Sequence, residues 1–178
     1  MHTACGPELR YEVHRGRVTR CFAERPRNLA DCLAAAVTHA PESEAVVDGP
    51  RRMTYAGLDS AVQGLAASLA AQGLARGERV AILLGNRLEY PVIVLACALG
   101  GWIAVPLNLR HSPAELVHAL EASTAAVLFH EADAVLPDLP STVSIRVAVA
   151  DDIALPCAPP RAFDAVDEDD AAVILFTS

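Results

Sequence analysis

At 178 residues, 53% of them hydrophobic, the chain holds enough apolar material for one ordinary core and too little for two large domains. The formal net charge is −8, and the excess lies near the C-terminus: residues 1–130 carry 12 arginines and 12 acids, whereas residues 131–178 carry 2 arginines and 10 acids. A surface of that sign repels phosphate backbones, so we expect no nucleic-acid partner.

The chain contains no lysine, which excludes a Schiff base, a Walker lysine and a lysine general base within these residues. The cysteines are odd in number, and none form a C-x-x-C pair; they are Cys5, Cys21, Cys32, Cys97 and Cys157. This pattern favours the reduced thiols of a cytoplasmic protein over a disulfide framework or a zinc site. The six histidines are equally scattered, and we assign them structural or surface roles.

Residues 1–27 form an N-terminal arm that is mildly basic and lacks an apolar run of signal-peptide length. We expect a solvated flank. Residues 90–109 are uncharged over about the length that spans a bilayer, but Pro91, Gly100, Gly101 and Pro106 divide them. They therefore predict a buried helix followed by a buried strand, with no membrane span.

The first half of the remaining chain predicts two helices and a hairpin. Asn28 is placed to cap a helix that ends before Pro41. Residues 44–48 have the pattern of a short strand that turns into a partner at residues 52–54. Thr54 is placed to cap a second helix, which stops at Gly73.

From Gly77 onward, strands and helices alternate. We predict buried strands at residues 79–84, 103–106, 125–129, 145–149 and 171–176. Asn86 and Glu89 resemble a capping box for a helix that runs to Leu99, although Pro91 moves its expected start toward Tyr90. The run Ser112-Pro113-Ala114-Glu115 is typical of a helix start. The proline-rich stretch 137–170 is interpreted as loop around one strand.

These elements predict an α/β fold, with a mostly parallel sheet and helices on both faces. Ligands of such folds bind outside the carboxyl ends of the strands. The chain contains no G-x-G-x-x-G, G-x-x-x-x-G-K-[ST], G-x-S-x-G or H-E-x-x-H motif, so we assign no catalytic residue and no metal ligand. The four acids at residues 167–170 cannot all face one ion and are interpreted as a solvated loop. Thr177 and Ser178 follow the last predicted strand, where small hydroxyl side chains can close around phosphate oxygens if glycines follow.

Five segments strengthen the interpretation of Thr177 and Ser178. They are residues 53–58 (MTYAGL), 77–86 (GERVAILLGN), 99–108 (LGGWIAVPLN), 112–116 (SPAEL) and 172–178 (AVILFTS). In this order they closely resemble the N-terminal part of the AMP-forming acyl-CoA synthetases and their adenylate-forming relatives. The resemblance covers residues 28–178 and implies a partial AMP-binding domain, part of the N-terminal subdomain of an adenylate-forming enzyme.

In that family, Thr-Ser opens a glycine-rich loop, Thr-Ser-Gly-Thr-Thr-Gly-x-Pro-Lys, which holds the ATP phosphates. The resemblance thus implies phosphate-binding roles for Thr177 and Ser178, and we expect the chain to be truncated at the start of this loop. It also implies ATP, Mg²⁺ and coenzyme A, and a small-molecule carboxylic acid from fatty or aromatic acid metabolism. The acid attacks the α-phosphate of ATP to give acyl-adenylate and pyrophosphate, and the thiol of coenzyme A then displaces AMP. Since most of the family's catalytic residues, a lysine among them, come later, we expect this chain alone to be inactive.

Two departures from the family pattern bear on this interpretation. Gly57 stands where the family commonly has glutamate, which removes the capping-box partner of Thr54. Asn108 stands where amino-acid-adenylating domains of peptide synthetases often have aspartate, which favours an acyl-CoA synthetase. Three alternatives stay open: such an amino-acid-adenylating domain, a non-catalytic truncated or remnant module, and an unrelated doubly wound nucleotide binder such as an oxidoreductase.

Overall fold

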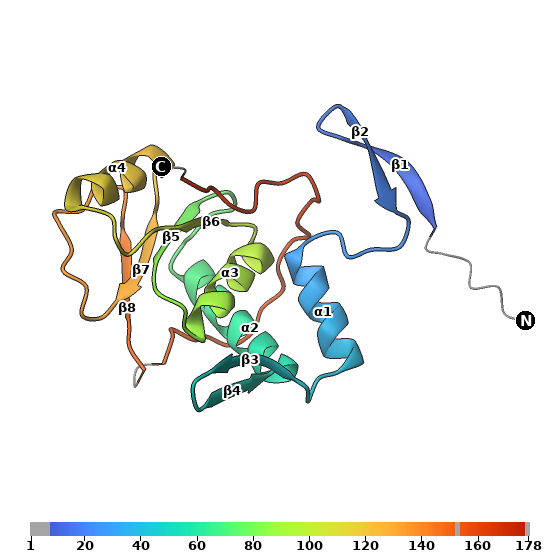
Figure 1. Cartoon of the computed structure of the whole chain (residues 1–178), viewed down its shortest axis with the longest axis horizontal. Helices are drawn as coiled ribbons and strands as arrows, with labels where there is room; N and C mark the ends of the chain where they lie inside the picture. Colours follow the sequence, from blue (N-terminus) through green and yellow to red (C-terminus); the bar gives the residue numbers. More distant parts are fainter. Residues whose placement is uncertain (1–7, 152–153, 177–178) are drawn as a thin grey trace, which may run out of the picture.

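A four-stranded parallel sheet forms the centre of the molecule, which is a computed structural model that describes residues 8–151 and 154–176. The strands are β5 (Arg79–Leu83), β6 (Ile103–Pro106), β7 (Val127–Glu131) and β8 (Ile145–Val149), in the order β6-β5-β7-β8 (Figure 1). Every pair is parallel, as predicted. The third predicted strand begins two residues later than expected, at Val127.

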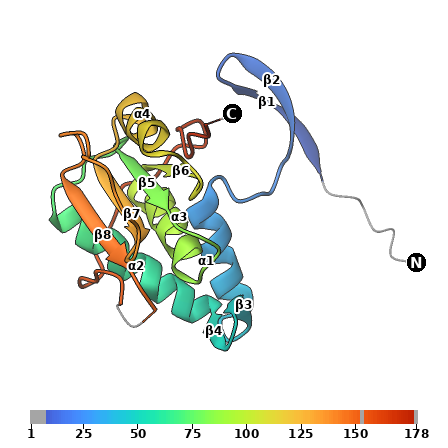
Figure 2. The ribbon, with the colours of Figure 1, turned by 60° about the vertical axis from the view of Figure 1, so that its left-hand side comes forward.

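Helices cover both faces of this sheet. Alternate side chains of β5 point to opposite faces: Val80 and Ile82 pack in the larger core cluster, and Ala81 and Leu83 pack in the smaller one. The larger cluster includes buried side chains of α1 (Leu29–His39), α2 (Tyr55–Ala71) and α3 (Glu89–Gly100). The smaller cluster includes buried side chains of α4 (Pro113–Ser123), which lies apart from the other helices (Figure 2). The predicted α/β fold is confirmed.

The helix starts follow the predicted caps in three cases out of four. The side chains of Asn28, Thr54 and Ser112 accept hydrogen bonds from the backbone at the start of α1, α2 and α4. Thr54 keeps its bond from the Gly57 amide, at 3.1 Å, although glycine offers no side chain to complete a capping box. The predicted Asn86 cap is wrong, because α3 begins at Glu89 after a Leu88 that has helical backbone angles and makes no side-chain cap. This start near Tyr90 agrees with the expectation from Pro91.

Two antiparallel hairpins lie outside the parallel sheet. The predicted one pairs β3 (Glu44–Asp48) with β4 (Arg51–Thr54). The other pairs β1 (Leu9–His14) with β2 (Arg17–Phe22) and projects from the body of the molecule (Figures 1 and 2). Most residues of both strands are exposed, in agreement with the expected solvated flank, although the sequence did not predict the strands. The turn residues Arg15 and Gly16 both have positive φ, at 48° and 76°, as a tight two-residue hairpin turn requires.

The last predicted strand, at residues 171–176, is also wrong as a full strand. Val173 makes an isolated parallel bridge to Ala104 of β6, and no ladder continues from it in the described chain. The side chain of Leu175 is 70% exposed, so this segment lacks the burial that its apolar sequence suggested. The described residues of 137–170 form loop around β8, as predicted. None of the helices in the described ranges is long and apolar enough to cross a membrane.

Candidate ligand site at the carboxyl edge of the sheet

The segment before Thr177 leads to the carboxyl edge of the parallel sheet. The Ala104 amide donates to the Ala172 carbonyl at 2.9 Å, and the Ile174 amide donates to the Ala104 carbonyl at 2.9 Å. Because this pairing is parallel to β6, the chain runs toward the edge at which β5, β6, β7 and β8 also end. Thr177 and Ser178, the predicted phosphate-binding residues, lie outside the described residues, but the chain ahead of them heads for the edge where α/β folds bind ligands.

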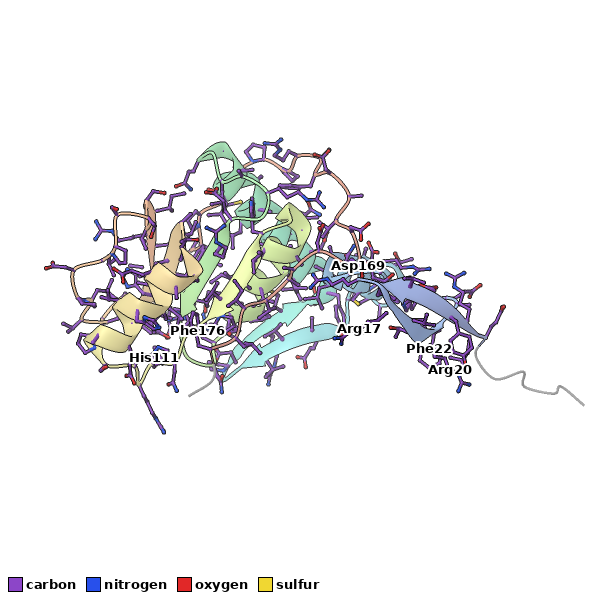
Figure 3. All side chains as sticks on the ribbon, turned by 90° about the horizontal axis from the view of Figure 1, so that it is seen from above. Arg17, Arg20, Phe22, His111, Asp169 and Phe176 are labelled. Carbon is purple, nitrogen blue, oxygen red and sulfur yellow. The ribbon has the colours of Figure 1, made fainter. Side chains whose placement is uncertain are left out.

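A cleft of about 580 Å³ lies beside Phe176 at this edge. Figure 3 shows Phe176 and His111 on the same side of the molecule. The cleft is formed mainly by the chain from the end of β6 into α4, and its lining includes Asn108, Arg110, His111 and His118. The Asn108 side chain accepts a hydrogen bond from the Arg110 amide at 2.9 Å, and the Asn108 carbonyl accepts one from the His111 amide at 3.0 Å. This tight turn places cationic and hydrogen-bonding side chains in the same cleft as Phe176, the last described residue.

His111 lies between two clefts. It lines the cleft beside Phe176 and also a neighbouring one of about 520 Å³ at the ends of β5 and β7, where Leu83 and Glu131 contribute. Its Nδ1 atom is buried and has no hydrogen-bond partner in the part of the chain that the structure describes. From the sequence we assigned every histidine a structural or surface role and did not single out His111. The signal that could have done so is its place in the loop between a parallel strand and the following helix.

Charged side chains at the same edge are already paired with one another. Arg87 binds Glu89 at 2.7 Å, Asp151 at 3.0 Å and Glu131, and a Glu131 oxygen accepts from the Gly85 amide at 2.8 Å. Burial alone would raise the pKa of Glu89, but hydrogen bonds from Arg87 and Arg51 outweigh burial and hold that pKa below its ordinary value. These contacts tie the loop after β5 to the end of β7, so we assign the network a structural role.

One cluster outside this edge has the side-chain types of a metal site. Ligand atoms of Glu12, His14 and Cys21 lie within 4.8 Å of one another on the projecting hairpin. However, Arg25 and Arg27 bind the Glu12 carboxylate at 2.7 and 3.0 Å. Hydrogen bonds from Arg25 and Arg10 hold the pKa of Glu12 far below its ordinary value. Because guanidinium groups already occupy this carboxylate, the cluster is poorly suited to a cation.

The four acids of residues 167–170 lie in a turn whose cationic neighbours come from distant parts of the chain. Glu168 pairs with Arg25 and Arg27, Asp169 with His14, and Asp170 with Arg76. The stretch is a loop, as interpreted, and the side chains of Asp169 and Asp170 remain 40% and 43% exposed, while that of Glu168 is 26% exposed. Ion pairs with arginine and histidine side chains therefore account for the acidic run. Among the described residues, these acids do not form a cluster that could hold a metal ion.

The fold is that of an α/β protein, with a candidate ligand site outside the carboxyl ends of its parallel sheet. The chain belongs to the family of AMP-binding enzymes, whose model matches residues 33–178. This membership agrees with the resemblance inferred from the five segments and sets aside an unrelated oxidoreductase.

Similar proteins include two ligases of known name. The chain is 32% identical over 126 residues to a medium/long-chain-fatty-acid–CoA/3-oxocholest-4-en-26-oate–CoA ligase of Mycobacterium marinum, a match that covers 67% of this chain and 23% of the relative. It is 36% identical over 147 residues to a feruloyl-CoA synthase of an Amycolatopsis species, covering 78% of this chain and 28% of the relative. The chain thus spans about a quarter of the length of these relatives.

The structure resembles a solved Mycobacterium tuberculosis fatty acyl CoA synthetase with a TM-score of 0.69 and 28% sequence identity. The match covers 85% of this chain and 33% of the synthetase chain. The described fold is therefore that of one part of a larger adenylate-forming enzyme fold.

Proposed function

We propose that this chain is the N-terminal portion of an ATP-dependent, AMP-forming acid–thiol ligase. The complete enzyme converts a carboxylic acid, ATP and coenzyme A into acyl-CoA, AMP and pyrophosphate through an acyl-adenylate. Residues 28–178 form the partial AMP-binding domain, and residues 1–27 form an arm that precedes it. The observation that supports the proposal is the parallel pairing of residues 172–174 with β6, which directs the described chain toward the carboxyl edge of the sheet.

Positioning is the main contribution of this chain to the proposed reaction. The hydroxyl groups of Thr177 and Ser178, with the backbone amides that follow them, would hold the ATP phosphates for attack by the carboxylate. The cleft beside Phe176 would contribute hydrogen-bond donors from Asn108, Arg110 and His111 to an anionic ligand. Mg²⁺ bound with ATP would neutralise phosphate charge in this reaction. Glu89 and Glu131 already bind Arg87, so we do not assign them to this ion.

The proposed substrate class is a fatty or aromatic carboxylic acid, with coenzyme A as the acceptor. The names of the fatty-acid and feruloyl ligases support this range, and both relatives share the acid–thiol chemistry. The Asn108 side chain lies at the cleft and supports a CoA ligase over an amino-acid-adenylating domain, as the sequence suggested. We also propose a cytoplasmic location, where ATP and coenzyme A are supplied.

The experiment that tests this function compares two proteins made from the gene. The first is the 178-residue chain, and the second is the product of the open reading frame read beyond Ser178. We expect the longer product to exchange pyrophosphate into ATP in the presence of fatty or aromatic acids and to form acyl-CoA, and the 178-residue chain to do neither. A stop codon directly after Ser178 would support a non-catalytic module, and exchange that depends on amino acids would support a peptide synthetase domain.

A further inference from the structure

We propose that the N-terminal arm positions the phosphate-binding loop, because an ion-pair clamp joins residues 12–27 to the turn at 167–170 that immediately precedes the segment leading to Thr177. Arg25 and Arg27 are the central positioning residues, with Glu12 and Glu168 between them. The assignment of this loop to phosphate binding rests on the proposed function. The clamp itself is independent of that function and can be measured without it.

The segment after the turn is weakly attached to the sheet. Val173 and Ala104 form an isolated bridge with two backbone hydrogen bonds, each 2.9 Å long. Beyond this bridge, the side chains of Leu175 and Phe176 are 70% and 38% exposed. Besides these bonds, only Ile174 packs, partly buried, against the smaller core cluster among the described residues of the segment. Contacts at so few points give limited resistance to a shift in register, so we infer that the position of this segment also depends on what holds the turn before it.

The turn is closed by hydrogen bonds among its own acids. The Asp170 amide donates to the Asp167 carbonyl at 3.1 Å, and the Asp167 amide donates to the Asp170 carboxylate at 3.0 Å. The Asp169 amide donates to the Asp167 carboxylate at 2.8 Å. The turn carries four consecutive acids, and their mutual repulsion disfavours this arrangement unless cations offset it.

Arginines of the arm supply those cations. The Glu168 carboxylate accepts from Arg25 Nε at 3.0 Å and from Arg27 Nη1 at 2.9 Å. Both guanidinium groups also bind Glu12 of β1, at 2.7 and 3.0 Å. The side chains of Arg25, Glu12 and Glu168 are only 17%, 17% and 26% exposed, and that of Arg27 is 38% exposed. Water therefore screens the pairs among the first three less than it screens a fully exposed pair.

Further contacts hold the turn from both sides. On the arm, His14 Nδ1 lies 3.0 Å from an Asp169 carboxylate oxygen, and Arg15 Nε donates to the Asp169 carbonyl at 3.0 Å. On the body, Arg76 pairs with Asp170 and donates to the Ala165 carbonyl at 2.9 Å. Figure 3 shows Asp169 close to Arg17, at the turn end of the hairpin. The arm and the turn therefore form one unit, although more than 140 positions separate them along the chain.

Geometry connects this unit to the loop. Six residues, 171–176, lead from the turn to Thr177, a length of about 20 Å if fully extended. A released turn would let this segment slide along β6 and displace the residues that hold phosphate. Because misplacement by about 1 Å can slow an enzyme about a hundredfold, the clamp matters for the reaction without touching a substrate.

Hydrogen–deuterium exchange on the 178-residue chain tests the clamp. In Glu168→Gln and Arg27→Gln, we expect the amides of Ala104 and Ile174 to exchange about tenfold faster or more, while the β5 amides of Ala81 and Ile82 stay protected. Arg27→Lys keeps the charge but not the bridging guanidinium, and should give an intermediate rate. Arg20→Gln is the matched control, since Arg20 lies opposite Tyr11 on the hairpin and makes no ion pair with any residue of the described ranges.

The outcomes separate the clamp from global effects. Faster exchange at Ala104 and Ile174 alone supports the proposal. Unchanged exchange at both amides in Glu168→Gln and Arg27→Gln overturns it. If Glu168→Gln also accelerates exchange of the β5 amides, the milder variant Arg27→Lys distinguishes a local effect from a global one. Equal acceleration of exchange at the β5 amides and at the Ile174 amide in Arg27→Lys would contradict a local clamp.

The longer gene product tests the link to the reaction. There, Arg27→Gln should raise KM for ATP by about tenfold and leave KM for the acid nearly unchanged, and Arg20→Gln should change neither. An unchanged KM for ATP in a variant whose Ile174 amide is released would overturn the positioning role. If the unaltered product lacks pyrophosphate exchange, the proposed function fails, while the exchange data still decide whether the clamp exists.

Discussion

Val173 lies directly beside Ala104 of β6 in a parallel bridge. The amide and the carbonyl of Ala104 bind the two residues that flank Val173, Ala172 and Ile174. This pairing extends the sheet beyond β6 by a single residue pair and orients the chain toward the carboxyl edge. It leaves the side chains beyond it largely uncovered: Leu175 is 70% exposed and Phe176 is 38% exposed.

The exposed edge predicts poor solution behaviour of the 178-residue chain. We expect it to bind a dye that reports apolar surface and to form aggregates at high concentration, because uncovered strand edges associate. Leu175→Lys should lower both effects. Val135→Lys is the control, since Val135 is 97% exposed in the loop after β7 and lies outside the uncovered sheet edge. A monodisperse chain that melts cooperatively and binds no dye would contradict this prediction.

The capping box of α4 predicts a measurable loss of stability in Ser112→Ala. The Ser112 hydroxyl accepts from the Glu115 amide at 3.4 Å, and the Glu115 carboxylate accepts from the Ser112 amide at 2.7 Å. Removing the hydroxyl should lower the free energy of unfolding by about 1 kcal/mol, measured by urea denaturation. Ser141→Ala, at an exposed loop position, should leave the midpoint unchanged. Equal effects of the two substitutions would show that the cap adds nothing.

The Arg87 network predicts a larger effect. The side chains of Arg87 and Glu89 are each only 11% exposed, so Arg87→Gln leaves two carboxylates without their main partner. We expect the free energy of unfolding to fall by roughly 2–3 kcal/mol. Arg52→Gln breaks a pair with Glu44 in which both side chains are more than half exposed, and should cost less than about 1 kcal/mol. A smaller effect at Arg87 than at Arg52 would contradict the structural role of the network.

The clamp predicts that docking of the arm against the turn at residues 167–170 weakens both at low pH and at high pH. A hydrogen bond to Asp169, helped by the charges of Asp169 and Glu168 and by Glu12, raises the pKa of His14 above its ordinary value of 6.5. Protonated His14 therefore contributes stability in full below pH 6.5, and this contribution is lost as pH rises through the raised pKa. Hydrogen bonds from Arg27 and Arg25 lower the pKa of Glu168 below 4.5, so its contribution is present above pH 4.5 and is lost as pH falls.

Docking should accordingly be strongest between about pH 4.5 and 6.5. The Arg15 amide faces the Asp169 carboxylate at 3.4 Å, so its hydrogen exchange reports docking of the arm. The measured rates are corrected for the intrinsic pH dependence of amide exchange. The other charged or titratable groups around His14 are Glu12, Glu168 and Cys21. His14→Ala should remove the loss at high pH and keep the loss at low pH, whereas His39→Ala, at the exposed end of α1, should preserve both. A high-pH loss that persists in His14→Ala would assign it to another group.

Local signals in the sequence predicted most of the parallel domain. Asn28, Thr54 and Ser112 cap helices where their side chains predicted, because capping depends on backbone groups only a few residues away. Asn86 failed as a cap because the backbone at Leu88 is already helical and the neighbouring Glu89 pairs with Arg51 and Arg87, contacts that come from other elements. The apolar run at residues 171–176 failed as a full strand because a strand needs a partner along its length, and Val173 finds one only at Ala104.

The amino-acid sequence by itself determined the alternation of strands and helices, the parallel sheet and the membership of the AMP-binding family. These depend on apolar periodicity and on short motifs that are contiguous in the chain. Only the tertiary structure decided that residues 9–22 form a hairpin, that the acids of residues 167–170 meet arginines of the arm, and that His111 lies between two clefts. Arginines and acids separated by more than 140 positions leave no periodic or local signal, since their pairing depends on how the whole chain folds.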